Sequence, residues 1–405
     1  MKQLFIYKIF PILLLCFAIN GCTEQYILQT NNFENALVVE ATITNELKKQ
    51  NIKISRTFRL EESGPTFESG ADVSITDNEG NQYQFEEEDS IYVSTTEFKA
   101  IQGRKYKLNF TTRDGSSYNS TSETLTAVNE IENITATVQT KQEQKGVQIN
   151  VSSYDPNRTS KYYRYEYDET YKIITPLWDP DTAILLPPIE IGGHREIGLI
   201  PRTGESKTCY STDYSKEILL TTTNELSEDR VNFPVRFISN KNYIISHRYS
   251  ILVRQYIQSL EAYTFYKTLN ELSGSESILS QNQPGFFYGN INALNNPTEK
   301  IIGFFEVSSV SSKRIFFNYK DLFPNEPIPP YKEECEIRNW VFCFESANPD
   351  CKGAILLSNI ETNQLLYLDN YLYTNSIYQV YKMVPPACGD CTTFSSNKIP
   401  SFWIN

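Results

Sequence analysis

The chain has too few basic clusters and histidines for several classes of protein. Lysine and arginine never form a cluster longer than a pair, and the net charge over 405 residues is −12, so nucleic acid finds no basic patch. His194 and His247 lack the sequence context of a catalytic base, and no P-loop, GxSxG, HExxH or dinucleotide motif is present. Two carboxylates could still act together as in a glycosidase, since sequence does not show position in space. We expect a protein that is not an enzyme and uses no metal or cofactor.

Long apolar runs are also missing, apart from one near the N-terminus that is too short to cross a bilayer. Lys2 and Lys8 flank the start of an apolar stretch over 9–19. This stretch is shorter than the about 20 apolar residues that a membrane-spanning helix needs. This pattern is typical of a signal peptide. Its end, Ile19-Asn20-Gly21-Cys22, resembles a bacterial lipobox, in which Cys22 is diacylated. We expect a lipoprotein signal peptide over 1–21, a linker over 22–33 and a membrane anchor at Cys22. The alternative is a plain secretory peptide cut nearby.

Cysteine is scarce outside the C-terminal region. Without Cys16 in the signal peptide and Cys22 at the anchor, six remain, and an even number in an exported chain predicts disulfides. The candidates are Cys209, Cys335, Cys343, Cys351, Cys388 and Cys391. A redox motif or half a zinc site at Cys388-Gly389-Asp390-Cys391 is the alternative. Pro385-Pro386 before it favour a loop, and neither a second close cysteine pair nor a histidine lies nearby in sequence.

What the chain has in quantity is β-forming residues, including 27 Tyr and 23 Phe. Over 34–127, short apolar runs alternate with turn signals such as Asp77-Asn78-Glu79-Gly80 and Asp114-Gly115. We expect an Ig-like β-sandwich with strands over 36–44, 52–60, 72–76, 82–86, 91–95 and 105–112. The Asp77 turn lacks the further ligands of a calcium loop, so we interpret it as a hairpin turn. The acidic run over 86–89 is interpreted as a solvated loop.

Residues 128–405 predict a larger β-rich domain with one helix and a disulfide-stapled end. Strands are expected over 134–139, 147–152, 161–175, 249–256, 304–310 and 314–319, and a helix over 259–272. In the third strand, strict alternation places Tyr163, Tyr165, Tyr167 and Tyr171 on one face. Such a tyrosine stripe could stack on sugars or a peptide. Tyrosines on a half-buried sheet pack more often in a core, so we expect a core position.

A long connection over 176–206 follows that strand and contains several prolines and glycines. Connections of this length are usually functional or disordered, and its apolar side chains argue against disorder. We expect it to be a loop that contacts a partner protein through Trp178, Ile184, Leu185, Leu186 and Ile189. The alternative is that the loop folds back on its own domain.

Several segments, taken in order, resemble one known family. They are Leu37-Val38-Val39-Glu40, Gly70-Ala71-Asp72-Val73, Gly103-Arg104-Lys105-Tyr106, Tyr163-Arg164-Tyr165-Glu166, Cys209-Tyr210, Leu252-Val253-Arg254-Gln255, Gly289-Asn290-Ile291, 388–391 and 400–403. The chain is similar to Bacteroidota lipoproteins known as domain of unknown function 4249. The resemblance implies an envelope lipoprotein with a β-sandwich and a second β-rich domain, often encoded near TonB-dependent outer-membrane receptors. It implies no catalytic residue. The chain has tyrosines where the family's Tyr-Arg segment tends to carry Trp.

These observations together predict a non-enzymatic lipoprotein of the cell outer membrane, on its periplasmic face or at the cell surface. We expect it to act by protein contact, as an accessory subunit of a TonB-dependent receptor or a related outer-membrane β-barrel complex. The alternative is a surface lipoprotein for binding or adhesion, which would bind a glycan or a peptide through the tyrosine stripe or the long connection.

Overall fold

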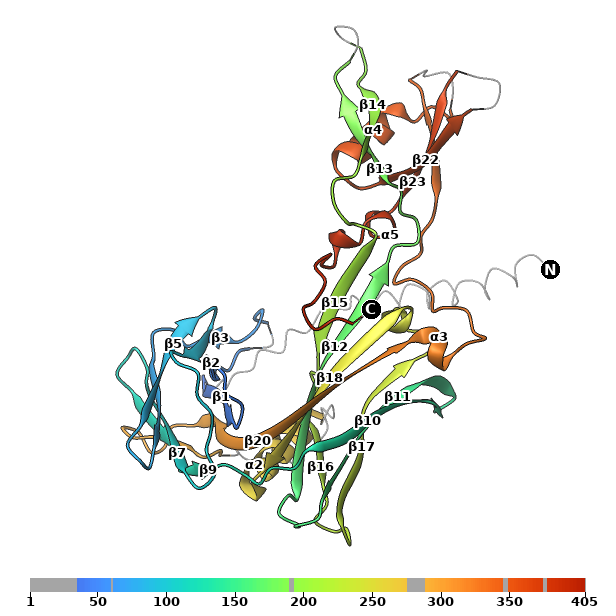
Figure 1. The fold of residues 1–405 in the computed structure, drawn as a ribbon. Coiled ribbons are helices and arrows are strands. Elements are labelled where there is room, and N and C mark those ends of the chain that lie inside the picture. The colour runs from blue at the N-terminus through green and yellow to red at the C-terminus, as the bar shows by residue number, and fades with distance from the viewer. Residues whose placement is uncertain are drawn as a thin grey trace, which may run out of the picture.

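The computed structural model describes residues 35–59, 61–188, 193–274, 288–344, 349–373 and 377–404. The signal peptide, Cys22, the linker and Ile189 lie outside the described residues. The chain is mainly β, as predicted, with 49% strand and 11% helix. Three parts follow one another in space: an N-terminal domain, a central domain and a smaller distal lobe that projects from the end of the central sheet (Figure 1). Among the described residues no helix is long and apolar enough to span a membrane.

The N-terminal domain consists of short, mostly antiparallel strands around one core. Its strands are β1 (Leu37–Thr44), β2 (Asn51–Arg56), β3 (Thr66–Phe67), β4 (Asp72–Asp77), β5 (Gln82–Glu88), β6 (Ile91–Ser94), β7 (Lys105–Thr111), β8 (Ser117–Ser120), β9 (Glu123–Thr124) and β19 (Ile291–Ala293). Alternate side chains of β7 are buried, as a sheet with one solvated face requires. The Asp77 carboxylate accepts hydrogen bonds from the backbone amides of Glu79 and Asn81, and Gly80 takes a positive φ of 89°. The hairpin turn is therefore held by its own residues.

One long strand joins the N-terminal and central domains. We expected two strands over 304–310 and 314–319, and this is wrong: β20 is continuous from Ile301 to Asn318. Its first half pairs with β1 in parallel, and its second half pairs with β18 (Arg248–Gln258) in antiparallel. Ser309 and Ser311, near the middle of the strand, are buried and hydrogen-bonded. The Ser309 amide donates to Thr126 Oγ1 at 2.9 Å, and Ser311 Oγ donates to Glu130 Oε2 at 2.6 Å. The N-terminal core also takes side chains from β19 and β20, far along the chain.

The central domain packs two sheets face to face. One contains β12 (Tyr162–Ile174), β15 (Thr208–Tyr214), β16 (Leu219–Thr222), β18 and β20; the other contains β10 (Ile131–Lys141), β11 (Gln144–Asp155) and β17 (Asp229–Ser239). The tyrosine stripe lies in the core between them, as predicted. Tyr163, Tyr165 and Tyr171 are at most 3% exposed, and Tyr165 stacks on Phe233 of β17 with ring centroids 5.1 Å apart. The fourth tyrosine of the stripe, Tyr167, is half-buried and packs against the same core, so the stripe is chiefly part of the core.

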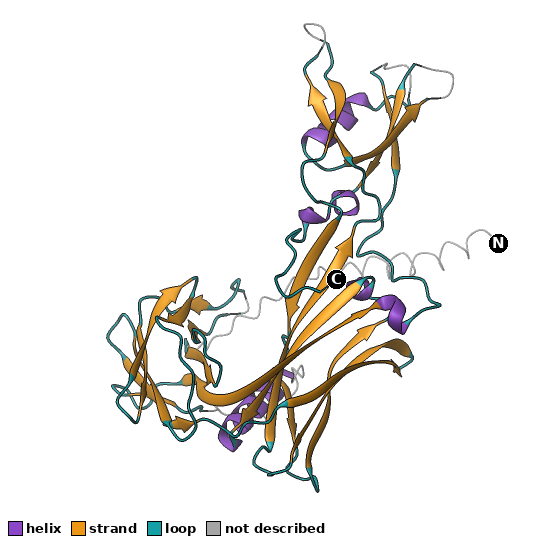
Figure 2. Cartoon of the chain, in the orientation of Figure 1, coloured by secondary structure: helices purple, strands orange, loops and turns teal. Residues whose placement is uncertain are grey.

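The predicted long helix is α2 (Leu260–Gly274), which packs on the other face of the central sheet (Figure 2). Ser259 caps it, because its Oγ accepts a hydrogen bond from the Ala262 amide at 3.1 Å. Further short helices are the 3₁₀ turn η1 (Tyr243–Ile245) and α3 (Tyr319–Leu322).

The distal lobe is built from two distant stretches, 176–206 and 332–387. Its elements are β13 (Asp181–Leu186), β14 (Glu196–Pro201), β21 (Arg338–Phe342), α4 (Gly353–Glu361), β22 (Leu366–Leu372), β23 (Gln379–Val384) and α5 (Pro386–Gly389), with the 3₁₀ turn η2 (Cys391–Thr393) at its base. The expected irregular loop over 176–206 is wrong, because its described part forms a β13–β14 hairpin. α4 was not predicted either.

Candidate functional site

The hairpin of the distal lobe has one face packed on the lobe and one face exposed. Ala183, Leu185 and Ile197 point inward and pack on a small core that includes the fully buried Leu356 of α4 and Met383 of β23. Leu185, one of the expected partner contacts, is therefore half-buried within the lobe. Successive side chains of a β-strand point to opposite faces, so Leu185 points into the lobe while its neighbours Ile184 and Leu186 point outward.

The exposed face of the hairpin holds Ile184, Leu186 and Ile200. Leu186 is 40% exposed and Ile200 is 42% exposed, while Ile184 is half-buried. Ile184 pairs with Gly198, and the Leu186 side chain lies over this glycine: a Cβ there would stand 3.0 Å from Leu186 carbons. The absence of a side chain at Gly198 therefore leaves a flat apolar surface. We call Ile184, Leu186 and Ile200 the hairpin face.

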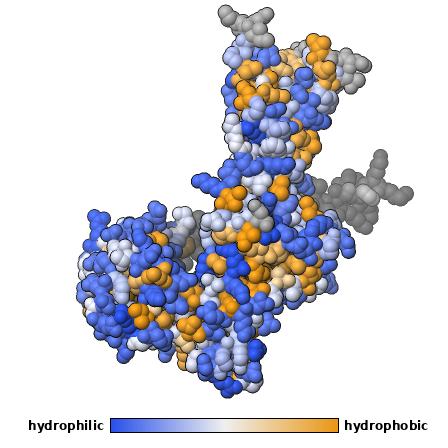
Figure 3. Space-filling view, in the orientation of Figure 1, coloured by the Kyte–Doolittle hydropathy of each residue, from blue (hydrophilic) through white to orange (hydrophobic). Residues whose placement is uncertain are grey.

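Exposed apolar side chains are frequent over the rest of the lobe. Eight of the 22 large exposed hydrophobic side chains among the described residues lie on this lobe, although it is the smallest of the three parts. They are Leu186, Leu199, Ile200, Ile337, Ile355, Tyr371, Leu372 and Ile377. Figure 3 shows hydrophobic groups on the lobe face in view. Concentrations of this kind mark contact surfaces more often than isolated exposed residues do.

One disulfide fixes the base of the lobe to the central domain, and a second closes the base itself. Cys209 on β15 bonds Cys391 in η2, and Cys335 bonds Cys388 in α5; the third bond, Cys343–Cys351, lies further inside the lobe. All six predicted cysteines are thus paired. Cys388 and Cys391 each bond a different distant cysteine, so the redox and zinc interpretations of this motif are wrong. No group of three potential ligands for a metal occurs among the described residues.

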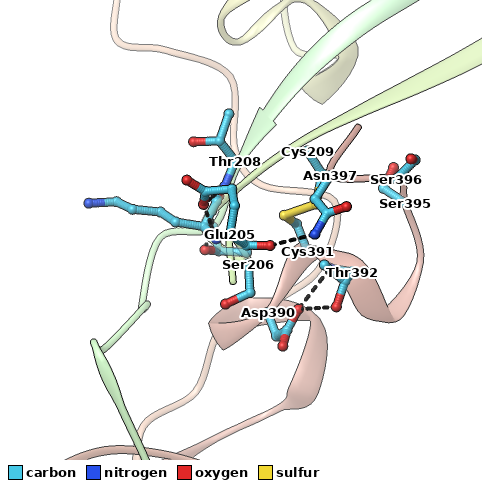
Figure 4. Close-up of a disulfide and its surroundings, with 12 residues drawn as sticks. Glu205, Ser206, Thr208, Cys209, Asp390, Cys391, Thr392, Ser395, Ser396 and Asn397 are labelled. Carbon is cyan, nitrogen blue, oxygen red and sulfur yellow. Dashed lines mark hydrogen bonds between the residues drawn. A yellow bond between two sulfur atoms is a disulfide. The ribbon is translucent and has the colours of Figure 1, made fainter. Parts of the chain in front are cut away.

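Hydrogen bonds reinforce the same junction. The Leu177 amide donates to the Cys388 carbonyl at 3.0 Å, and the Cys391 amide donates to the Ser206 carbonyl at 2.9 Å. Figure 4 shows Ser206, Asp390 and Thr392 around the Cys209–Cys391 bond. The four segments that meet at this junction, near residues 177, 206–209, 335 and 388–391, are therefore joined by disulfides and backbone hydrogen bonds, which restrain the orientation of the lobe.

Trp178 belongs to this junction and not to the hairpin face. Its indole Nε1 donates to Ser206 Oγ at 3.0 Å, and Lys207 Nζ lies 5.4 Å from the centre of its ring. Nearby, Arg202 Nη1 pairs with Asp390 Oδ2 at 3.1 Å, and both side chains are largely buried. Trp178 therefore contributes to the structure of this junction, and its expected contact with a partner stays a prediction. Ile189, the remaining candidate, lies outside the described residues.

We predict that the mature chain contains no free thiol when it is denatured without reductant. All six cysteines would be oxidised, and a disulfide that closes a long loop contributes about 3 kcal/mol or more in the entropic model. Thiol counting with a chromogenic reagent checks this. Two reactive thiols at Cys388 and Cys391 would contradict the pairing, whereas the same assay after reduction provides the positive control.

Both histidines have local explanations. The exposed His194 ring stacks on Phe344, with centroids 3.6 Å apart. His247 is half-buried, and burial together with the charge of Lys172 lowers its pKa. Among the described residues, neither histidine forms a hydrogen bond with a serine, cysteine or carboxylate that would make it part of a nucleophilic triad.

A buried acid in the central core was missed at the sequence level. Glu169 lies on the tyrosine face of β12 and is 5% exposed. Its carboxylate accepts two hydrogen bonds from Arg236 of β17, at 3.0 and 3.1 Å, and one from the Tyr249 hydroxyl of β18 at 2.6 Å. Burial, and then the neighbouring Glu169, raise the pKa of Tyr249. The sequence did contain a sign of this acid. Glu169 follows the tyrosines at the same two-residue spacing, so it must lie on their buried face, where an acid has to be paired.

Comparison with protein-family models gives one match. Residues 23–314 match the model described as Domain of unknown function (DUF4249), which is more than half of the chain. The hairpin lies within the match, and residues 332–387 of the lobe lie beyond it. The likeness over 388–391 and 400–403 therefore stays an expectation. No curated protein shows a significant match to the chain.

Proposed function

The chain belongs to the DUF4249 family, and from this premise we propose that it is a non-enzymatic outer-membrane lipoprotein that acts by protein contact. Its partner would be a TonB-dependent receptor or a related outer-membrane β-barrel, for which it serves as an accessory subunit. The proposal includes lipidation of Cys22 as the anchor.

The observation that carries the proposal is the hairpin face on a fixed lobe. Leu186 and Ile200 are apolar and accessible, and the disulfides at the base limit the freedom that the lobe could lose on binding. A surface that is already ordered loses little conformational entropy when a partner docks, so more of the apolar burial appears as affinity.

A membrane-embedded partner fits the anchoring. A lipid anchor confines the lipoprotein to the same bilayer as a β-barrel, which raises the effective concentration of one for the other. A modest apolar contact is then sufficient for a stable complex. A β-barrel also presents extended loops at the membrane surface that a projecting lobe could reach.

We predict that the double variant Leu186→Asp/Ile200→Asp loses its partner without losing stability. Each carboxylate would have to be desolvated in the interface, whereas in the free protein both side chains are solvated. The native lipoprotein is purified from mild detergent and co-purifying proteins are identified. The melting temperature should stay close to the wild-type value, because surface changes of this kind usually alter stability by about 0.5 kcal/mol or less.

A matched control is the double variant Leu47→Asp/Leu226→Asp, which changes two exposed leucines outside the lobe, 65% and 55% exposed. It should retain the partner. Equal co-purification by both double variants, or the absence of any β-barrel among the wild-type partners, would contradict the proposal. Replacing all of 183–191 is a poorer test, because it removes Leu185 from the core of the lobe.

A further inference from the structure

The face of β12 opposite the tyrosine stripe lines a cleft between the central and N-terminal domains. Two adjoining hollows of about 470 and 670 Å³ form it. β12 and β18 line one side, β1 and β2 line the other, and α2 contributes Tyr266. The hollows share Glu40, Arg164, Glu166, Ile218 and Tyr266, so they are continuous. Clefts of this size at domain boundaries are common positions for ligands.

Arg164 is fixed within this cleft. Its guanidinium lies between the rings of Tyr256 and Tyr266, 4.3 and 4.8 Å from their centres. Nη2 pairs with Glu306 at 3.2 Å, and Nη1 pairs with Glu166. The side chain is only 9% exposed, and its buried Nε donor has no hydrogen-bond partner among the described residues. A buried arginine held this firmly orients the groups around it, Glu166 above all.

Six of the eight charged side chains that line the cleft are paired with one another, whereas the exposed Lys216 and Glu217 form no ion pair among the described residues. Arg254 makes two hydrogen bonds with Asp168, at 2.5 and 2.8 Å, and Lys53 lies 3.1 Å from Glu40. The lining contains equal numbers of each sign. The acids are Glu40, Glu166, Asp168 and Glu217, and the bases are Lys53, Arg164, Lys216 and Arg254. A charged ligand would have to compete with existing ion pairs, whereas hydroxyl groups can use the remaining lone pairs and N–H donors without breaking them.

An aromatic ring stands at the open side of the cleft. Tyr214 lines the smaller hollow, pairs with Asp168 across β15 and β12, and is 66% exposed. An exposed tyrosine offers a flat apolar surface with a polar tip. Beside it, Asp168 and Arg254 present planar groups with fixed donor and acceptor directions. Flat ring surfaces together with planar polar groups are complementary to a sugar, which has C–H faces and equatorial hydroxyls.

We infer that this cleft binds a neutral oligosaccharide, with Tyr214 stacked on one sugar ring and Glu166, Asp168 and Arg254 hydrogen-bonded to hydroxyls. None of the residues that line the site belongs to the distal lobe, so the site is independent of the proposed contact with a β-barrel.

The test uses the full lipoprotein in a detergent without a sugar headgroup. Neutral oligosaccharides of glucose, mannose and galactose, two to five units long, are titrated by calorimetry, with oligogalacturonides and tripeptides as charged comparators. At least one neutral oligosaccharide should bind in the millimolar range or tighter. The Tyr214→Ala variant should bind it about tenfold more weakly, which corresponds to the loss of one aromatic contact.

The control variant is Tyr371→Ala, which changes a 44% exposed tyrosine on the lobe and should leave the affinity unchanged. Melting curves of both variants check that folding is intact. The inference is overturned if no neutral oligosaccharide binds at millimolar concentration, if only the charged comparators bind, or if Tyr214→Ala and Tyr371→Ala bind the sugar equally. Co-purification of a membrane partner by the Tyr214→Ala variant should be unaffected in every case.

Discussion

The Cys22→Ala variant should be recovered in the soluble fraction, whereas the wild-type protein should remain with the membrane at high salt. Each buried acyl CH₂ group contributes about 0.8 kcal/mol, so two or three chains hold a protein on a bilayer almost permanently. No helix among the described residues could span a bilayer, and a net charge of −12 disfavours anionic headgroups. Fractionation followed by immunoblotting measures the result.

Two further forms of the protein separate the effect of the anchor from that of signal-peptide cleavage. Cys16→Ala changes a cysteine inside the predicted signal peptide, so the mature protein should be identical to wild type and stay with the membrane. Residues 23–405 behind a plain secretory signal should be soluble, even if an uncleaved signal peptide retains Cys22→Ala. Membrane retention of that last form at high salt would rule out the lipid as the main anchor.

Local sequence patterns located about half of the strands: the predicted ranges match eleven of the 23 strands among the described residues. Alternate side chains of β7 are buried, and period-two alternation is a property that the sequence shows directly. The same rule placed the tyrosines of β12 on one face, although Arg164 on the opposite face is buried as well. For β20 the prediction of two strands was wrong, because buried hydrogen bonds such as that of Ser311 to Glu130 keep its polar middle within one strand.

The distal lobe could not be predicted because its two halves are far apart in the chain. The inward face of β13 is buried only because α4 and β22 cover it. These two elements come more than 150 residues later in the chain. The disulfides follow the same principle. The count of cysteines predicts oxidation, but the pairing of Cys209 with Cys391 depends on a contact over 182 residues. The cleft was not predicted either, because Arg164 and Glu306 are distant in sequence and meet only in the folded sheet.

The buried acid of the central core leads to the last prediction. Glu169→Gln should lower the free energy of unfolding by about 3 kcal/mol, because the amide leaves Arg236 without a counter-charge between the two sheets. The side chain of Arg236 is 29% exposed, so water partly compensates and the loss should lie at the lower end of the range for buried pairs. The Tyr249 hydroxyl would also exchange a carboxylate acceptor for a neutral one.

Urea unfolding of three variants distinguishes loss of the charge pair from general sensitivity of the site. Glu225→Gln changes an exposed acid and should alter stability by about 0.5 kcal/mol or less. The double variant Glu169→Gln/Arg236→Met should recover part of the loss, since no buried charge then remains unpaired. If Glu169→Gln is as mild as Glu225→Gln, the pair does not stabilise the contact between the sheets. If the double variant is less stable than Glu169→Gln alone, Arg236 contributes through interactions other than its pairing with Glu169.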